Sequence, residues 1–521
     1  MDNKKERERA ELHKIIWNIA DDLRGTVDGW DFKQYVLGML FYRYISENIT
    51  DYINKNEHEA GNISFNYQEL DDSSITDDIK DELIDTKGYF IYPSQLFYNV
   101  YKRAGSDENL NETLHNIFRS IENSAVSRQS EDNFKGLFDD FDVNSKKLGA
   151  SIKERVEKLR KLMSGTASMN LLSYGDNTID VFGDAYEFLM GMYASNAGKS
   201  GGEYYTPQEV SELLTRLTLS GKKEVNKVYD PACGSGSLLL KYAKILGHNN
   251  VRIGFFGQET NITTYNLCRI NMFLHNIPYD KFSIAHGDTL IKPYHYDDEP
   301  FEAIVSNPPY STKWKGDEDP VLINDPRYSP AGVLAPKSKA DFAFIMHSLS
   351  WLASSGTAAI VCFPGIFYRG GAEQKIRKYL VDNNFIDCII QLPENLFYGT
   401  SIATCIMVLK KNKSDNSILF INASKEYVKV TNNNKLTDKN IDNILKYYEE
   451  RKNIEYISSF IKYEKVVEEN YNLSVNTYVE LEDTREKIDV NVLNAEIEAI
   501  VKKQQVLRDN INKIINELGD I

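Results

Sequence analysis

The spacing of hydrophobic and polar positions changes along this chain near residue 225. Before that point, apolar residues recur three or four positions apart, the spacing of one helix face, as in the stretches 11–20 and 31–45. After it, short β-rich runs alternate with helical stretches, which predicts a parallel sheet with crossover helices. We expect the last two runs, which lie close together, to form an antiparallel pair at one edge. The predicted strands are Val225–Tyr229, Ile253–Gly257, Ala303–Ser306, Ala358–Phe363, Ile386–Gln391, Cys405–Leu409 and Ile418–Ile421.

The last stretch of the chain has a third pattern. Apolar residues stand alternately three and four positions apart over four heptads, and the polar Gln504 interrupts them once. This spacing is typical of a coiled-coil seam, so it predicts a helix that packs on another protein or on another helix of its own domain. Of these two, we favour a partner protein. The apolar members of this heptad seam are Val490, Leu493, Ile497, Ile500, Leu507, Ile511, Ile514 and Leu518.

These patterns predict a division into three parts. A chain of 521 residues exceeds the size, about 250–300 residues, at which a single hydrophobic core usually stops growing. We expect a helical N-terminal domain (1–165), an α/β domain with a doubly wound mixed sheet (166–475) and a helical C-terminal tail (476–521). Four prolines and two glycines interrupt the α/β pattern between residues 311 and 338. A loop of this length is usually functional or disordered.

Composition excludes several classes of protein. Hydrophobic residues make up 42% of the chain and charged residues 26%, as in soluble globular proteins. No apolar run approaches the roughly 18 residues of a membrane-spanning helix, and no apolar segment follows the charged N-terminus as in a signal peptide. The five cysteines are widely spaced and form no CxxC pair, so we expect buried thiols, no metal site and a cytoplasmic location.

A glycine-rich turn follows the first predicted strand. Its glycines would allow a tight strand-to-helix turn and a close approach of the backbone to a ligand. Glu259 ends the next strand about 25 residues further on, where a carboxylate can accept both hydroxyls of a ribose, and Asp288 could meet an adenine. No phosphate-binding lysine directly follows the glycines, which excludes a triphosphate-binding loop. Taken singly, these features could also be a structural turn and solvated carboxylates. The candidate cofactor-binding residues of the turn are Asp230, Pro231, Gly234, Ser235 and Gly236.

The next predicted strand ends at the sequence Asn307, Pro308, Pro309, Tyr310. Two prolines remove two backbone donors and hold the chain extended, which fixes the Asn side chain at the sheet's carboxyl edge, where ligands bind in open α/β sheets. An amide oxygen and a backbone carbonyl can accept both hydrogens of an exocyclic amine, which keeps the nitrogen lone pair out of the aromatic ring. Tyr310 offers a flat face for stacking an extracted base. The motif therefore indicates methylation of an amine on a base.

With these motifs in this order, the sequence resembles the modification (methyltransferase) subunit of type I restriction-modification systems over nearly its whole length. Residues 17–25 resemble the family's N-terminal domain, and residues 202–207 resemble the motif that precedes the cofactor turn. Segments 340–344, 363–371 and 397–401 match later family motifs. The resemblance implies a Rossmann-like enzyme that depends on S-adenosylmethionine and methylates N6 of adenine in a specific bipartite sequence of double-stranded DNA.

The resemblance also implies roles for single residues. Asn307 and the Pro308 carbonyl would hold the amine, Tyr310 would stack the base, and Phe397 could form the opposite wall of the base pocket. No nucleophilic cysteine is required, and Asn rather than Ser at the start of the motif favours adenine over a cytosine-N4 target. The residues expected to contact the cofactor ahead of the glycine turn are Tyr204, Tyr205, Thr206 and Pro207.

Partners follow from the resemblance and from the charge of the chain. The family's enzymes are complexes in which two modification subunits join one specificity subunit, and an ATP-dependent restriction subunit can add to them. The net charge of −15 agrees with this, because duplex binding depends on Lys and Arg neutralising phosphates. We therefore expect both a basic face hidden in the average and a partner that supplies DNA affinity. Lys313, Trp314 and Lys315 could guide DNA or form a solvated loop tip, and residues 41–44 could touch a partner or belong to a helical core.

Two other functions stay open. The sequence Asn-Pro-Pro-Tyr also occurs in methyltransferases that act on glutamine in proteins and on RNA bases, although those chains are usually shorter and lack such an N-terminal domain and heptad tail. Methylation of DNA, but not of ribosomes or release factors, would separate these substrate classes. The chain could also be a non-enzymatic scaffold whose bound cofactor stabilises a complex. Full methylation by an Asn307→Ala variant would contradict the catalytic assignment.

Overall fold

The computed structural model describes residues 7, 10–14, 16–18, 31–169, 181–196, 206–316, 319–397, 400–430, 433–482 and 490–519. The chain divides into two compact units, Met1–Val479 and Glu480–Ile521. The first unit contains both the helical N-terminal part and the α/β part, and the second contains one helix.

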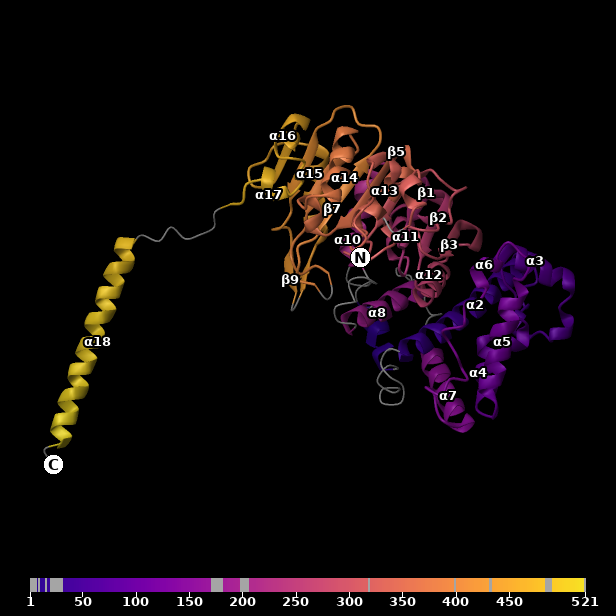
Figure 1. The fold of residues 1–521 in the computed structure, drawn as a ribbon. Coiled ribbons are helices and arrows are strands. Elements are labelled where there is room, and N and C mark those ends of the chain that lie inside the picture. The colour runs from indigo at the N-terminus through magenta and orange to yellow at the C-terminus, as the bar shows by residue number, and fades with distance from the viewer. Residues whose placement is uncertain are drawn as a thin grey trace. The chain divides into compact units, whose positions relative to one another are not determined.

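Helices make up the N-terminal part of the first unit, as predicted (Figure 1). Helix α7 begins at a capping box, in which Ser151 accepts a hydrogen bond from the backbone N–H of Glu154 and the Glu154 carboxylate accepts one from Ser151. Helix α3 ends at Gly88, whose φ of 87° suits glycine at a helix end. The helices are α2 (Asp31–Glu59), α3 (Asp77–Lys87), α4 (Phe97–Ala104), α5 (Leu110–Ser124), α6 (Glu131–Phe134), α7 (Ile152–Ser168) and α8 (Val181–Asn196).

The α/β part is built on a mixed sheet. Among the described residues, nine strands pair in the order β11-β8-β6-β7-β5-β4-β1-β2-β3. The neighbours from β5 to β3 are parallel, β7 runs antiparallel to both β5 and β6, β8 is parallel to β6, and β11 is an antiparallel edge strand. The strands are β1 (Val225–Asp230), β2 (Val251–Glu259), β3 (Phe282–His286), β4 (Phe301–Ser306), β5 (Leu352–Cys362), β6 (Ile386–Gln391), β7 (Cys405–Lys410), β8 (Ile418–Asn422) and β11 (Ser458–Ile461).

Both faces of this sheet are covered. Ile304 belongs to one hydrophobic cluster and its neighbour Val305 to another, and both side chains are fully buried. Since successive side chains of a strand point to opposite faces, each face packs against its own layer, which explains the nearly continuous apolar strands. The helices of this part are α10 (Gln208–Leu219), α11 (Ser237–Leu246), α12 (Ile262–Leu274), α13 (Asp341–Trp351), α14 (Ala372–Asp382), α15 (Asp438–Glu450), α16 (Tyr463–Glu468) and α17 (Val475–Tyr478).

All seven predicted runs form strands, but the predicted antiparallel edge pair of β7 and β8 is wrong. Strand β7 pairs with β5 and β6 inside the sheet, and β8 pairs in parallel with β6. The physical reason is that β7 is apolar on both faces, so an internal position buries more of it than an edge would. Sequence analysis did not predict β3, β11 or the short hairpin of β9 (Val428–Val430) and β10 (Asn433–Lys435).

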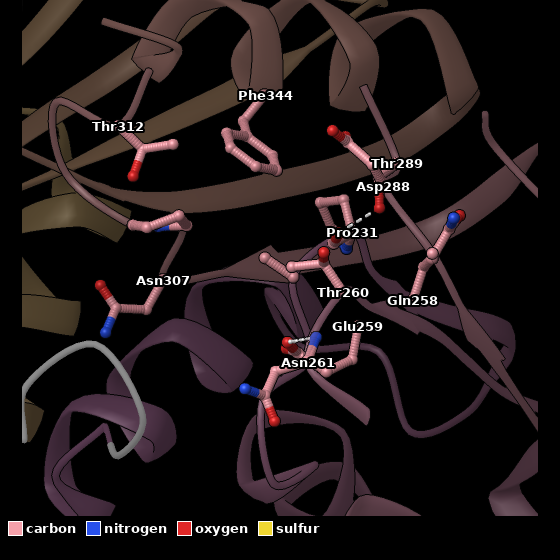
Figure 2. A pocket seen from close by; sticks show the side chains of 13 residues that line it. Pro231, Gln258, Glu259, Thr260, Asn261, Asp288, Thr289, Asn307, Thr312 and Phe344 are labelled. Atoms are coloured by element: carbon pink, nitrogen blue, oxygen red, sulfur yellow. Dashed lines mark hydrogen bonds between the residues drawn. The ribbon is translucent and has the colours of Figure 1, made fainter. Parts of the chain in front are cut away.

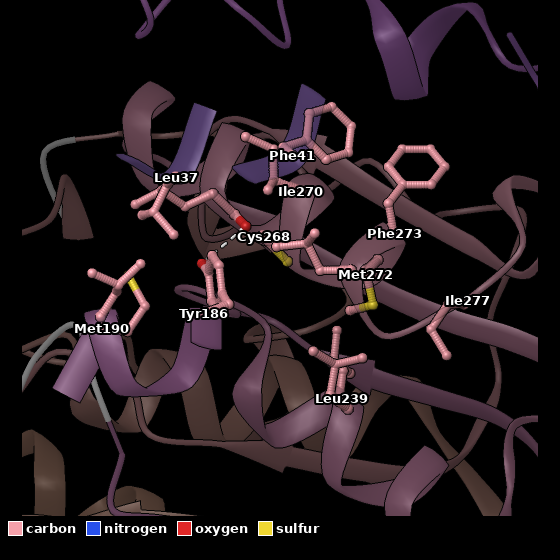
Figure 3. Packing of buried hydrophobic residues seen from close by; sticks show 14 of the residues in the cluster. Leu37, Phe41, Tyr186, Met190, Leu239, Cys268, Ile270, Met272, Phe273 and Ile277 are labelled. Atoms are coloured by element: carbon pink, nitrogen blue, oxygen red, sulfur yellow. Dashed lines mark hydrogen bonds between the residues drawn. The ribbon is translucent and has the colours of Figure 1, made fainter. Parts of the chain in front are cut away.

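The N-terminal helices and the α/β part share one hydrophobic core, part of which is shown in Figure 3. The ring of Phe41 in α2 lies 5.9 Å, centroid to centroid, from the ring of Phe273 in α12. Tyr186 of α8 is buried, and its hydroxyl donates to the carbonyl of Leu267 over 3.0 Å. All of residues 41–44 are buried, so this run has the second of its two predicted roles, that of a helical core.

The described residues of the segment between Tyr310 and α13, 311–316 and 319–340, are folded against the α/β part, and we call them the insert. Trp314 is 9% exposed, its indole N–H donates to the Pro336 carbonyl over 3.1 Å, and its ring packs edge-on against Tyr328. The prediction that Trp314 guides DNA is therefore wrong, because the indole serves the packing of the insert. Lys313 and Lys315, on either side of it, are exposed.

The second unit contains α18 (Val490–Gly519), which confirms the predicted C-terminal helix. Each apolar member of the heptad seam is at least 43% exposed. No described helix, α18 included, is both long and apolar enough to cross a membrane.

Candidate active site

The carboxyl ends of four neighbouring parallel strands meet at one edge of the sheet. Asp230 is the last residue of β1 and Glu259 the last of β2, while Asp288 follows β3 and Asn307 follows β4. Because β4, β1, β2 and β3 are adjacent in that order, these residues lie within a few strand spacings, about 4.8 Å each, of one another. Ligands bind at this edge in open α/β sheets.

The turn after β1 is fixed by its neighbours. The backbone N–H of Cys233 donates to the carbonyl of Gln258 in β2 over 3.1 Å. Gly236 precedes α11 with a φ of 80°, in the left-handed region that favours glycine. A Cβ at this position would also lie 2.7 Å from the sulfur of Cys268 in α12. Gly236 is thus required both by the backbone and by packing, and Cys233 is a buried thiol of the turn.

Glu259 is tied to this turn and Asp288 faces it from β3. One carboxylate oxygen of Glu259 accepts a hydrogen bond from the N–H of Gly234 over 3.0 Å, and the other accepts one from Asn261 over 2.8 Å. Burial raises the pKa of Glu259, while these backbone donors lower it. Asp288 is exposed and accepts a hydrogen bond from the N–H of Leu290. Carboxylate oxygens have room for further donors, so both groups can accept hydroxyls or amines of a ligand.

Asn307 is held in a defined orientation at the end of β4. It is 7% exposed, its Nδ2 donates to the Thr206 hydroxyl over 3.1 Å, and its Oδ1 accepts a hydrogen bond from the Tyr310 hydroxyl over 2.6 Å. These two bonds assign which end of the amide is the acceptor. Ser311, which follows Tyr310, donates its N–H to the two oxygens of the Asp341 carboxylate at 3.2 and 3.3 Å. This contact holds the corner against α13. The sequence had predicted a rigid corner here.

One cavity of about 400 Å³ joins these groups (Figure 2). Its volume falls within the range of small-molecule sites, about 300–1,000 Å³. Figure 2 shows Asn307 on one side, Asp288 on the opposite side and the Phe344 ring between them. The predicted site residues that line this cavity are Pro231, Glu259, Asp288, Asn307 and Pro309.

Asp230 is fully buried beside the cavity. Burial raises its pKa to about 7, although the backbone N–H of Ala232 donates to its carboxylate and lowers the pKa. The charge of nearby Glu259 raises the pKa further. Near neutral pH the carboxyl therefore carries a proton in part of the molecules, and a cation bound beside it would favour the ionised form.

Some predicted site residues lie elsewhere. Tyr204 and Tyr205 lie outside the described residues. Pro207 is the residue before α10, and Ser235 is buried with its carbonyl accepting a hydrogen bond from Asn271. Phe397 is 1% exposed, packs in the core and does not line the cavity, so its role as a base wall stays a prediction. Within the described ranges, no cluster of His, Cys, Asp or Glu suits a metal ion.

Eight lining residues were not predicted individually, namely Ala232, Gln258, Thr260, Asn261, Gly287, Thr289, Thr312 and Phe344. Phe344 belongs to the segment 340–344, whose match to a family motif was the available signal. Asn261 has an ordinary structural role as well, because its side chain caps α12 by accepting the N–H of Thr264. Thr260 and Thr312 follow strand ends closely, but nothing in their residue type marked them.

Comparison with known proteins agrees with this geometry. The family model described as N-6 DNA Methylase matches residues 177–487, and the HsdM N-terminal domain model matches residues 12–165. The chain is 50% identical over 533 residues to a type I restriction enzyme MpnII methylase subunit of Mycoplasma pneumoniae, covering 99% of this chain and 98% of that protein.

Solved structures give the same result. The type I restriction-modification system methyltransferase subunit of Streptococcus thermophilus is 36% identical with a TM-score of 0.82, covering 91% of this chain and 100% of its own. A chain from a structure of complex assembly and conformational transition of the type I R-M system is 17% identical with a TM-score of 0.65 over 98% of this chain and 99% of its own, and it shows the fold alone. This chain therefore belongs to the N-6 DNA methylase family, as a methyltransferase subunit of the type I restriction-modification kind.

Proposed function

We propose that this chain transfers a methyl group from S-adenosylmethionine to N6 of adenine in a specific bipartite sequence of double-stranded DNA. It would do so as the modification subunit of a multi-subunit type I complex, protecting host DNA and taking part in restriction with partner subunits. The observation that supports this most directly is the single cavity that joins Asn307 to Glu259 and Asp288. Such a cavity can hold an amine acceptor next to a nucleoside-bearing cofactor.

The residues of the cavity fit S-adenosylmethionine. Glu259 would accept the ribose hydroxyls and Asp288 the adenine amine, while Phe344 and Pro309 provide apolar surface. The carboxylates, with Asp230 beside them, suit a ligand that carries positive charge. When bound, the cofactor supplies a methyl carbon already activated by its sulfonium sulfur. What the chain must add is mainly alignment of the acceptor nitrogen.

The chain's own groups can orient that nitrogen. An amide oxygen has two lone pairs, so the Tyr310 hydroxyl does not exhaust the capacity of Asn307 Oδ1, which can accept one N6 hydrogen. The Pro308 carbonyl would accept the other. With both hydrogens held, the nitrogen lone pair would stay out of the base and be available to the methyl group. The methyl group's bond to the cofactor's sulfur would break as the N–C bond forms, and one of the held protons would then pass to water. Tyr310 would stack the flipped base.

The exposed face of α18 and the net negative charge of the chain both support partner subunits. The exposed heptad seam gives a specificity subunit a surface on which to pack, and two modification subunits would join one such subunit. A chain of net charge −15 benefits from a partner that binds DNA. We also propose an ATP-dependent restriction subunit as a further partner and the cytoplasm as the location. We keep the division of the chain at residues 165 and 475 as a proposal about function. It is not a division into separate cores, because the first two parts share one hydrophobic core.

The test is co-expression of the full chain with its specificity subunit in an unmethylated host, followed by long-read sequencing of the DNA. We expect N6-methyladenine at one bipartite motif. Asn307→Ala should remove the modification while S-adenosylmethionine binding is retained. Asn249 is exposed and does not line the cavity, so Asn249→Ala should leave the modification unchanged. Retained methylation in Asn307→Ala would contradict the catalytic role. Methylation of release factors or ribosomes without DNA modification would favour the other substrate class.

A further inference from the structure

Arg327 connects the insert to the wall of the cavity that carries Asp288. Its side chain is 1% exposed, and its charge is balanced by the carboxylate of Asp325 at 2.7 Å. Its guanidinium donates to the carbonyl of Thr289 over 2.7 Å and to that of Leu290 over 2.9 Å. These two carbonyls directly follow Asp288 in the chain, so the planar fork of the arginine holds this segment at two adjacent points.

Thr289 carries the connection on to the glycine turn. Its side chain is 4% exposed, and its hydroxyl donates to the carbonyl of Pro231 over 2.6 Å. Both residues line the cavity, on two different strand ends. Two hydrogen bonds, from Arg327 to Thr289 and from Thr289 to Pro231, therefore fix the distance between the cavity wall at Asp288 and the turn after β1.

A second path runs from Arg327 to β1 through His347. Arg327 Nη1 lies 3.1 Å from His347 Nδ1, and His347 Nε2 lies 2.9 Å from the hydroxyl of Tyr229. Since arginine only donates, His347 Nδ1 accepts, and the single proton of a neutral ring is on Nε2. Burial and the charge of Arg327 both lower the pKa of His347, which keeps the ring neutral. Tyr229 precedes Asp230, so this path also ends at the glycine turn.

The insert that carries Arg327 begins at the corner of Asn307. Ser311 is fastened to Asp341, and Thr312 lines the cavity. The insert therefore begins at the corner where the base would bind. Through Arg327 it also holds the opposite wall of the same cavity, the segment that follows Asp288. Because of this geometry, the insert can position the wall at the end of the cavity where the cofactor would bind.

We infer that Arg327 is a positioning residue for the cofactor: from the insert, it holds Asp288 and Thr289 in register with the glycine turn. The inference rests on the proposed function, since it takes S-adenosylmethionine as the ligand of the cavity. Arg327 touches no part of that ligand in this scheme and acts through the peptide segment that it holds. Its loss should weaken binding of the cofactor far more than it slows methyl transfer at saturation.

The test is the affinity of the full-length chain for S-adenosylmethionine, measured by calorimetry, in wild type and in Arg327→Lys. An ammonium cannot reproduce the fork to two carbonyls and to His347, so we expect the Kd to rise about tenfold. In the complex with the specificity subunit, the KM for S-adenosylmethionine should rise by a similar factor while kcat changes less than about threefold. Asp325→Asn, which keeps the arginine but removes its counter-charge, should raise Kd in the same direction by a smaller factor.

Arg377→Lys is the matched control, because Arg377 is equally buried and also donates to backbone carbonyls, those of Ile366 and Tyr471, but lies outside the cavity. It should lower the melting temperature and leave Kd unchanged. A folded Arg327→Lys and a folded Asp325→Asn that both bind with wild-type Kd would overturn the inference, as would equal losses of affinity in the Arg377 control. If the wild-type chain itself fails to bind, the proposed function fails instead.

Discussion

The side-chain amide of Asn307 donates a hydrogen bond to the hydroxyl of Thr206 over 3.1 Å, although the two residues stand 101 positions apart in the chain. Thr206 was expected to contact the cofactor. The structure adds a contact to the corner where the base would bind. The Thr206 hydroxyl therefore helps to hold the Asn307 amide in its orientation, and the effect of removing this hydroxyl can be measured.

Replacing Thr206 with valine keeps the shape of the side chain but removes the acceptor for Asn307 Nδ2. We expect kcat for DNA methylation to fall about tenfold, because the amide can then turn away from the orientation that the proposed reaction needs. Single-turnover methylation with the full complex measures this. Thr215→Val is the control, because that hydroxyl is buried but bonds only within α10, to the carbonyl of Ser211. Equal kcat values in wild type and Thr206→Val would show that the bond has no catalytic consequence.

Asp230 gives a prediction for the dependence of stability on pH. Its folded pKa of about 7 lies above the ordinary value of 3.8, so between about pH 4 and pH 7 the folded state binds the proton more tightly than the unfolded state. Stability should then fall as pH rises through this window, by up to about 4 kcal/mol from this group. The isosteric Asp230→Asn removes the titration and should flatten that part of the curve, making the free chain more stable than wild type at pH 8.

Urea unfolding of both chains between pH 5 and pH 8, without cofactor, measures the difference. Asp415→Asn serves as the control, because Asp415 is exposed and its pKa is lowered by hydrogen bonds from Ser417. The same slope in wild type and in Asp230→Asn would mean that Asp230 is ionised in the folded chain at all these pH values.

Seven of the strands and the polar residues at their ends could be predicted from the sequence, because both depend on local patterns. Glu259 and Asn307 each end or follow an apolar run, and the parallel order of the strands then brings them to one edge. The position of β7 in the sheet could not be predicted in this way, because an apolar run does not indicate which strands pair with it. The burial of Trp314 was missed for a related reason: a Pro-rich segment without periodicity gives no sign of the core that it joins.

Arg327 was not predicted because its partners at the cavity wall are backbone carbonyls, which every residue has. An arginine in a long loop normally suggests a solvated or DNA-binding side chain. Only the fold places Thr289 and Leu290 within its reach. Thr206, by contrast, was predicted from the family motif, but the motif could not show that its hydroxyl bonds to Asn307.

Lys313 is exposed at the start of the insert, three residues after Tyr310, and its role in guiding DNA stays a prediction. Lys313→Ala should weaken binding of the complex to cognate and non-cognate DNA by similar factors. The slope of log K against log salt concentration should become shallower by about 1. Fluorescence anisotropy at several salt concentrations measures it, with Lys223→Ala, exposed before the amino end of β1, as the control. An unchanged slope would place Lys313 away from the DNA backbone.

The exposed heptad seam of α18 gives the last prediction. Ile497 is 50% exposed, and an aspartate there would place a charge in the centre of any interface that the seam forms. Ile497→Asp should abolish co-purification with the specificity subunit while the chain alone keeps its melting temperature and its affinity for S-adenosylmethionine, because α18 forms a unit of its own. Lys502→Asp introduces the same residue on the opposite side of the helix and should leave assembly intact. A stable complex with Ile497→Asp would show that the subunits meet elsewhere, and loss of cofactor binding would show that α18 supports the first unit.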